Sequence, residues 1–218
     1  MKQIKNSLET SDKRSNETLN SPLGVRGSMK TFGIAIKIFL VFTILTGIIY
    51  PLLVTGIAQL VFPHQAHGSL IVKDNKIIGS ELIGQQFDST LYFSSRPSAI
   101  AYNPLPSGGS NYGLTSTKLK NQVADRKKQF IKFNQLNPNT EIPSEMLFAS
   151  ASGLDPHISP EAAELQINRI AKARYFDNTQ KQKLKALVEE MSEEPQLMCL
   201  GESRINVSLL NIALDKLK

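Results

Sequence analysis

The apolar residues of this chain are concentrated in one long run near the N-terminus. From Ile38 to Phe62, 25 consecutive residues include no Asp, Glu, Lys, Arg or His. A helix rises about 1.5 Å per residue, so this run would be about 37 Å long, more than the roughly 30 Å hydrocarbon core of a bilayer. The pattern predicts a transmembrane helix over residues 31–62 and argues against a fully soluble cytoplasmic enzyme.

Charge differs between the two sides of this run. The first 37 residues have seven cations and three acids, a local charge of +4, and the rest of the chain adds only +2 to the total of +6. The positive-inside rule therefore predicts a cytoplasmic N-terminus and an extracytoplasmic main domain. The run exceeds the 7–15 residues of a signal-peptide core and ends in bulky Leu60-Val61-Phe62-Pro63. We predict an uncleaved signal anchor and not a cleaved signal peptide.

The same pattern divides the chain into three parts. Residues 1–30 are polar and rich in Ser, Asn and Lys, which is typical of a disordered tail, here on the cytoplasmic side. Residues 31–62 are the predicted signal-anchor helix. Residues 63–218 have the size of a single domain.

Within residues 63–218 the pattern predicts an α+β domain. Short apolar stretches between turns are typical of strands, and capping residues before amphipathic runs are typical of helix starts. The predicted strands are Leu70–Val72, Ile77–Ile78, Leu91–Phe93 and Met146–Phe148, and the predicted helices are residues 116–134, one capped by Ser159 before Pro160, one opened by a Thr179–Gln182 capping box, and residues 206–216. Glycines and prolines between Ser94 and Gly113 predict one long loop, and such loops are often functional.

Four residues of the predicted span recur at intervals of four: Thr43, Gly47, Pro51 and Thr55. Small residues on one stripe let a second helix approach closely, so this stripe is a candidate packing surface in a larger membrane complex. Alternatively, it reflects only the general frequency of Gly and Pro in membrane helices. The pattern alone leaves both interpretations open.

The common motifs of catalysis and metal binding are missing from the sequence. There is no Gly-x4-Gly-Lys-Ser/Thr phosphate loop, no His-Glu-x-x-His and no paired Cys, so we predict no catalytic residue and no metal ligand. The nearly neutral outer part argues against nucleic-acid binding. Cys199 lies in the apolar stretch 197–200 and is expected to be buried. Arg126, Lys127 and Lys128 are expected to form a solvated helix face.

One loop motif resembles a hydrolytic triad in its residue types. Ser152, Asp155 and His157 lie within six positions on one loop, whereas triad residues converge from separate elements. We therefore predict that these residues and Gly153 fix the loop before the helix at Pro160, or contact a partner. Arg96, with its several donors, is expected to fix its own loop or an interface in the same way.

A second loop motif is Ser107-Gly108-Gly109-Ser110-Asn111. Its two glycines could let backbone N–H groups point at an anion, and Ser and Asn side chains add donors. It is a weak candidate for cofactor or partner binding, and the alternative is a tight structural turn.

Several motifs taken in order carry a family resemblance. They are Tyr50–Gln59, Gly68–Leu70, Gly79–Gln85, Tyr92–Phe93, Arg96–Ala99, Tyr102–Asn103, Ser107–Asn111, Ser150–Pro160, Leu200–Glu202 and Arg204–Val207. This series closely resembles the C-subunit family of the bacterial Kdp potassium-transporting ATPases, over about residues 35–215.

The resemblance implies a non-catalytic subunit of an ATP-driven potassium uptake pump, and therefore not an enzyme by itself. It would cross the bacterial inner membrane once, with residues 63–218 in the periplasm. Its partners would be the A, B and F subunits of the pump and the lipid bilayer, with potassium carried by the complex. The family is described as a catalytic chaperone that raises the ATP affinity of the B subunit. ATP thus enters through the family alone, and no cofactor bound by this chain on its own is predicted.

The predicted topology favours a role other than contact with ATP. Only the tail and one helix end would face cytosolic ATP, so assembly of the complex or capping of its outer face is the favoured role. The alternative from another class is a membrane-anchored exported hydrolase that uses Ser152 and His157. A solute-binding sensor would need cytoplasmic signalling machinery, which the N-terminal 37 residues do not supply.

Overall fold

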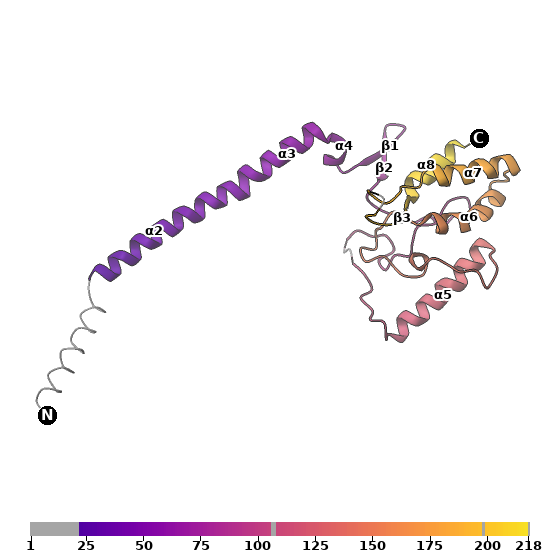
Figure 1. The fold of residues 1–218 in the computed structure, drawn as a ribbon, viewed down its shortest axis with the longest axis horizontal. Coiled ribbons are helices and arrows are strands. Elements are labelled where there is room, and N and C mark those ends of the chain that lie inside the picture. The colour runs from indigo at the N-terminus through magenta and orange to yellow at the C-terminus, as the bar shows by residue number, and fades with distance from the viewer. Residues whose placement is uncertain (1–21, 106–107, 198, 218) are drawn as a thin grey trace, which may run out of the picture. The chain divides into compact units, whose positions relative to one another are not determined.

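The computed structural model describes residues 22–105, 108–197 and 199–217. The chain divides into two compact units, Met1–Ala66 and His67–Lys218, and each is described by itself (Figure 1). The expectations for residues 1–21 and for Ser107 lie outside the described residues.

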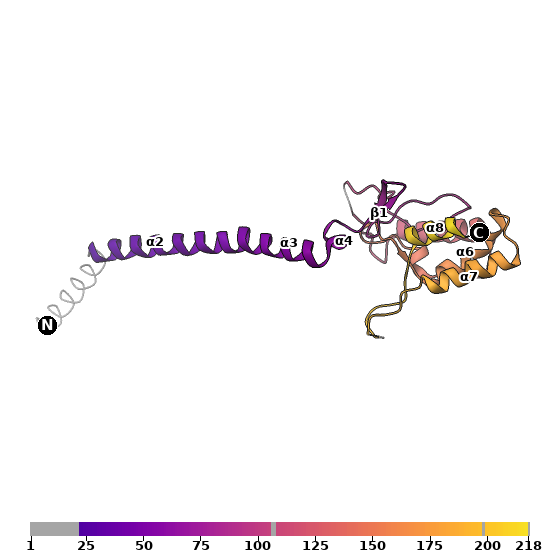
Figure 2. The same cartoon turned by 90° about the horizontal axis from the view of Figure 1, so that it is seen from above.

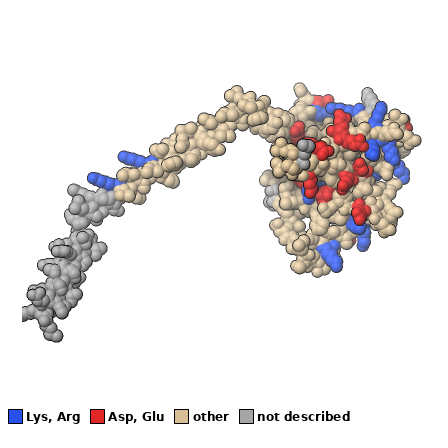
Figure 3. All heavy atoms as spheres, viewed as in Figure 1, with Lys and Arg blue, Asp and Glu red and all other residues tan. Residues whose placement is uncertain are grey.

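The first unit is one long helical segment. It consists of α2 (Pro22–Ile44), a π-helical turn η1 (Leu45–Ile49), α3 (Tyr50–Val61) and the short α4 (Pro63–Ala66). The stretch Met29–Val61 is long and apolar enough to cross a membrane, and none of it is buried within the chain. Its described cations, Lys30 and Lys37, lie toward the N-terminal end (Figure 3). Helix α2 begins at Pro22, nine residues before the predicted start of the anchor helix at residue 31.

The π turn lies directly before Pro51. Tyr50 N–H donates to the carbonyl of Leu45, five residues back, instead of four. Proline lacks an N–H and its ring crowds the carbonyl four residues earlier, and a wider turn relieves that crowding. Gly47 therefore lies within the π turn, while Thr43 Oγ1 donates to Phe39 O at 2.8 Å.

The second unit opens with a β-hairpin. Strands β1 (Leu70–Lys73) and β2 (Lys76–Ser80) pair antiparallel, with a register irregularity between Ile71 and Val72. The two turn residues, Asp74 and Asn75, both have positive φ, as a type I′ hairpin turn requires. This confirms the first two predicted strands. A second pair, β3 (His157–Ile158) with β4 (Ile205–Asn206), makes a separate two-stranded sheet.

Four helices supply most of the regular secondary structure of the domain. They are α5 (Thr117–Asn134), α6 (Pro160–Ala173), α7 (Asn178–Glu190) and α8 (Val207–Lys216). Ser116, Ser159 and Asn206 cap α5, α6 and α8 by accepting a backbone N–H, as the sequence predicted for Ser159. The capping box of α7 is Asp177 with Gln180, so the predicted Thr179–Gln182 box was wrong by two residues. Asp is as good an N-cap residue as Thr, and because Asp177 precedes Thr179 the helix begins at the earlier position.

The core is built around α6, which packs against both α5 and α7, while α7 packs against α8. Apolar side chains that are fully buried fill it, and they come from α6, α7 and α8, from the short strands β3 and β4, and from the segment at Phe93: Phe93, Ile158, Ala162, Ala163, Ile170, Leu184, Val188, Ile205, Val207, Leu210 and Leu214. Phe130 of α5 is buried beside them. The mixture of helices and small sheets confirms the α+β class.

Residues 146–148 do not form the predicted strand. A 3-10 turn, η2 (Ser144–Met146), follows Pro143, and the N–H groups of Leu147 and Phe148 both donate to Ser144 O. Met146 reaches the core from this turn. The apolar spacing was right about burial and wrong about the backbone, because three apolar residues fit a turn as well as a strand.

Residues 91–93 are also not in a strand, although Phe93 is fully buried. Asn211 Oδ1 accepts from Phe93 N at 2.8 Å, and Asn211 Nδ2 donates to Phe93 O at 2.9 Å. Gln166 contacts Ser94 N and Ser94 O in the same way, at 2.7 and 3.3 Å. Side-chain amides of α6 and α8 thus replace the neighbouring strand that this segment would otherwise need.

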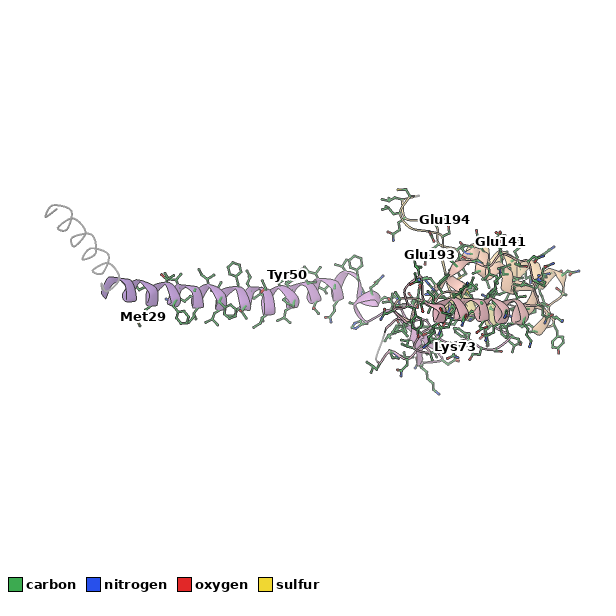
Figure 4. The ribbon with its side chains drawn as sticks, turned by 90° about the horizontal axis from the view of Figure 1, so that it is seen from below. Met29, Tyr50, Lys73, Glu141, Glu193 and Glu194 are labelled. Atoms are coloured by element: carbon green, nitrogen blue, oxygen red, sulfur yellow. The ribbon has the colours of Figure 1, made fainter. Side chains whose placement is uncertain are left out.

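The described residues of the segment 193–204, here called the arm, project from the domain on the side opposite the β1–β2 hairpin (Figures 2 and 4). Backbone hydrogen bonds join Glu193 to Arg204 and Gln196 to Leu200. Cys199 lies on the arm and is exposed, so the prediction of a buried thiol was wrong. Its apolar stretch has no core to enter, because the arm closes on itself away from the helices.

Candidate interface site in the loop cluster

The predicted site residues gather where two loops meet. We call the described residues 94–105, 108–113 and 150–159 the loop cluster. Backbone hydrogen bonds fix the loops to each other and to the end of the hairpin segment, from Ser150 N to Pro97 O at 3.1 Å and from Gly84 N to Leu154 O at 2.7 Å. The N-terminus of α6 follows directly and anchors the second loop through its Ser159 cap.

Arg96, Asp155 and His157 form the polar centre of the cluster. Arg96 Nη1 lies 2.6 Å from Asp155 Oδ2. The other carboxylate oxygen, Asp155 Oδ1, accepts from the backbone N of His157 at 3.0 Å and lies 3.4 Å from His157 Nδ1. The structure thus brings together three residues predicted to fix loops or contact a partner.

The charge of Asp155 is stabilised by these contacts. Burial alone would raise the pKa of Asp155, but the hydrogen bonds from His157 and the Arg96 guanidinium outweigh it and lower that pKa from 3.8 to about 2. Asp155 therefore stays ionised at any physiological pH and holds the turn before β3 and α6. Arg96 Nε is buried without a hydrogen-bond partner, so the ion pair is the main polar contact of this guanidinium.

Gly153 marks the closest approach of the two loops. Its φ is +71°, and a Cβ there would lie 2.5 Å from Ile100 Cγ1 and 3.2 Å from Gly108 O. A Cβ on Gly109 would likewise lie 3.0 Å from Ala151 O. The Gly108–Gly109 part of the second motif therefore packs against residues 151–153. Ser110 and Asn111 follow it at the surface, and anion binding there stays a prediction.

Ser152 does not join Asp155 and His157 in a triad. Its Oγ accepts from the backbone N of Leu154 at 3.1 Å and is exposed. Within the described loop residues, no hydrogen bond links Ser152 to His157. Asp155 is already paired with Arg96, so the arrangement fixes a turn and does not activate a hydroxyl. In the part of the chain that the structure describes, no three His, Cys, Asp or Glu side chains could hold a metal ion.

Beside the cluster lies a groove of about 840 Å³ between residues 86–102 and α5. Its walls combine aromatic and cationic side chains: Phe87, Arg96, Tyr102, Arg126, Phe130, Lys132 and Phe133. Tyr102 OH donates to Arg96 O, and burial raises the pKa of Tyr102 to about 12. The tyrosine therefore acts here as a neutral hydrogen-bond donor.

Sequence reasoning missed the roles of Tyr102 and Arg126. Arg126 was expected on a solvated face, but it is half-buried and its Nη1 donates to Leu147 O at 3.0 Å. Lys127 and Lys128 are exposed as expected. The sequence did contain a signal for the burial of Arg126. Arg126 is three residues after Val123 and four before Phe130, and this spacing places it on the same face of α5 as these two apolar residues.

Comparison with known proteins places this geometry in a family. Residues 32–216 match the sequence model of a family described as "K+-transporting ATPase, c chain". The chain belongs to the KdpC family. It is 49% identical over 193 residues to the potassium-transporting ATPase KdpC subunit of Geotalea uraniireducens, covering 87% of this chain and 99% of that protein. It is 46% identical over 187 residues to the KdpC subunit of Photorhabdus laumondii, covering 84% and 94%.

The KdpC match confirms the resemblance drawn from the motifs. It spans the apolar helix from residue 32 onward and every residue of the loop cluster. It supports membership in potassium transport and a membrane location, since KdpC relatives are named as subunits of a potassium-transporting ATPase and this chain has one helix fit to span a membrane.

Proposed function

We propose that this chain is a non-catalytic C subunit of an ATP-driven potassium uptake pump, and that its loop cluster helps to assemble and stabilise the complex. The subunit would cross the bacterial inner membrane once, with a cytoplasmic N-terminus and a periplasmic domain. Its partners would be the A, B and F subunits. The relatives are named as KdpC subunits of potassium-transporting ATPases, which supports the role as a pump subunit. The excess of cations before the apolar helix supports the proposed orientation in the membrane.

The observation that carries the proposal is that the described residues of the loop cluster are held closely to one another. Long loops are costly to order, yet these are fixed by an ion pair, close glycine contacts and backbone bonds. Loops held on a scaffold are where binding contacts concentrate, and preorganisation lowers the cost of association. A preorganised surface of this kind is suited to holding a partner.

The experiment that tests this role compares assembly with catalysis. Arg96→Ala removes the guanidinium that fixes Asp155, and Lys127→Ala removes an exposed cation of α5 as the matched control. We expect Arg96→Ala to lower the yield of purified complex and its potassium-dependent ATPase activity in proportion, while Lys127→Ala changes neither. Full assembly with unchanged activity would contradict the proposal.

A second candidate function is the chaperone role, in which the subunit raises the ATP affinity of the B subunit. The groove beside α5 favours it, because Arg126 and Lys132 lie there with Phe130 and Phe133, a suitable lining for a phosphate-bearing aromatic ligand. The proposed periplasmic placement argues against it. A fully assembled Arg96→Ala complex whose ATP affinity alone has fallen would favour this second role.

We also propose that the Thr43–Gly47–Pro51–Thr55 stripe packs on a helix of a partner subunit. Gly47 lies in the π turn, and nothing lies within 4 Å of where its Cβ would be, so a partner backbone has room to approach. Gly47→Leu should release the subunit from the complex and leave its membrane insertion intact. Gly56→Leu, off the stripe and equally open, is the control. Unchanged co-purification of Gly47→Leu would place the stripe against lipid.

A further inference from the structure

The β1–β2 hairpin has an apolar outer face that the domain does not cover. Val72 and Ile77 are directly paired across the hairpin and are 59% and 64% exposed. Leu82 and Ile83 follow β2 at once and are also exposed. The neighbouring Ile71 and Ile78 instead border a small cavity of about 270 Å³ with Tyr92 and Asn211. The hairpin therefore has one side toward the domain and one aliphatic side that no described residue of this chain covers.

We propose that this outer face rests on the surface of the lipid bilayer, at the boundary between head groups and acyl chains. The proposal rests on the transmembrane placement of Met29–Val61 proposed above. It adds a second membrane contact, made by the folded domain and separate from the anchor.

Tether length argues for lipid as the occupant. Leu70 follows Val61, the last residue of the apolar helix, by nine residues. A chain extends at most about 3.6 Å per residue, so Leu70, the first residue of the hairpin, stays within about 32 Å of Val61. Such a short tether holds the bilayer surface at a high effective concentration around the hairpin.

The chemistry of the face also favours lipid over a protein partner. Protein interfaces are enriched in Tyr, Trp and Arg anchors, whereas the exposed side chains here are aliphatic: Leu70, Val72, Ile77, Leu82 and Ile83. The hairpin tip is polar, with Lys73, Asp74, Asn75 and Lys76 (Lys73 is labelled in Figure 4). Lys73 Nζ also lies 3.7 Å from Asp215. A polar tip cannot enter hydrocarbon, so the hairpin would lie flat with its apolar face down.

Spin labels on the full chain test this contact. In a Cys199→Ser background, Ile77→Cys carries a nitroxide on the outer face, and Leu114→Cys carries the control label at a 96% exposed position of the same domain. The chain is reconstituted in vesicles of phosphatidylethanolamine and phosphatidylglycerol. We expect the Ile77 label to collide more with oxygen than with a water-soluble nickel chelate, and the Leu114 label to show the inverse ratio.

Two outcomes would overturn the inference. In vesicles, an Ile77 label as accessible to nickel as the Leu114 label would place the hairpin in water. In the assembled complex, an Ile77 label shielded from both reagents would mean that a protein covers it. A third label at Val54→Cys separates this inference from the anchor, because loss of lipid exposure at Val54 would contradict the transmembrane placement itself.

Discussion

Two segments of the domain without regular secondary structure are held in place by different kinds of contact. Residues 89–98 and the arm, residues 193–204, both lie outside the named helices and strands. The first is held by buried side chains from distant helices, through Gln166, Arg169 and Asn211. The arm is held by its own contacts, such as Arg204 Nε to Glu193 Oε2 at 3.0 Å.

The difference shows where irregular backbone can be structural. Residues 89–98 enter the interior at Phe93, and buried side chains supply hydrogen-bond partners for the backbone of Thr90, Phe93 and Ser94. The arm stands in solvent, where water supplies them, and its apolar tip residues Leu197 and Leu200 stay 82% and 58% exposed. Changes in the interior segment should therefore cost several times more than changes in the arm.

The largest expected effect comes from Gln166→Leu. Leucine fills a similar volume but leaves the half-buried Ser94 N and Ser94 O without their partner in Gln166, and it removes the acceptor 2.9 Å from Arg169 Nη2. Each unsatisfied buried group costs about 1–3 kcal/mol, so the free energy of unfolding should fall by about 3–5 kcal/mol. Urea unfolding of the full chain in detergent measures it.

The matched control is Asn168→Leu, two residues along α6 on its exposed face, which should change stability by less than about 0.5 kcal/mol. Equal effects at both positions would mean that the side-chain amides do not hold the segment.

The next effect, at the loop cluster, is Gly153→Ala. Alanine at φ +71° costs about 1–2 kcal/mol, and the contact with Ile100 Cγ1 adds about 1–3 kcal/mol of overpacking. We expect a loss of about 2–5 kcal/mol in the free energy of unfolding.

Gly201→Ala separates the two terms, because Gly201 on the arm has φ +95° with nothing within 4 Å of the added Cβ. Gly201→Ala should therefore lower the free energy of unfolding only by the backbone cost of alanine at positive φ, about 1–2 kcal/mol. A loss at Gly201 as large as at Gly153 would show that the two loops do not pack as closely as described.

A smaller and pH-dependent effect is expected from Asp155→Asn. The pKa of Asp155 is lowered from 3.8 to about 2, so the carboxylate stabilises the fold above about pH 4 and that contribution is lost as the pH falls toward 2. The shift corresponds to about 2 kcal/mol, reduced to about 1–2 because the side chain is 28% exposed.

Asp155→Asn should therefore be less stable than the parent chain at pH 7 and equally stable near pH 2. Asp125→Asn, on the exposed side of α5, should show no such gap. Chemical unfolding across this pH range measures both. A gap of constant size from pH 7 to pH 2 would contradict the ion-pair account.

Local signals predicted one part of this fold well. The Ser159–Pro160 start, the Asn206 start of α8, the β1–β2 hairpin and the apolar helix all depend on residues close in sequence. The strand expected at 91–93 failed for the opposite reason, since Asn211, the partner of Phe93, lies 118 residues away, and Gln166, the partner of the next residue Ser94, lies 72 residues away. Periodicity identifies a buried segment but not the group that pairs with its backbone.

The candidate site was predictable to the same extent. The Asx-type bond from His157 N to Asp155 Oδ1 is local, and its role in fixing the loop could be inferred from the sequence. The partner of Asp155 is Arg96, 59 residues earlier, and the family motifs named both residues without pairing them. The π turn at Leu45–Ile49 was missed, although Pro51 gave a signal for a local distortion.

The smallest effect is expected at Cys199, and it tests the arm directly. Because the thiol is exposed, a maleimide should react with it as fast in the folded chain as in urea, and Cys199→Ser should change the free energy of unfolding by less than about 0.5 kcal/mol. Ala171→Cys in the Cys199→Ser chain is the matched control, since Ala171 is buried in α6 and the thiol introduced there should react only on unfolding.

Protection of Cys199 in the folded subunit would contradict the exposed arm. Slow reaction in the assembled complex alone would instead show that a partner covers the apolar tip, and the arm would then resemble the interior segment in being fixed by contacts beyond itself.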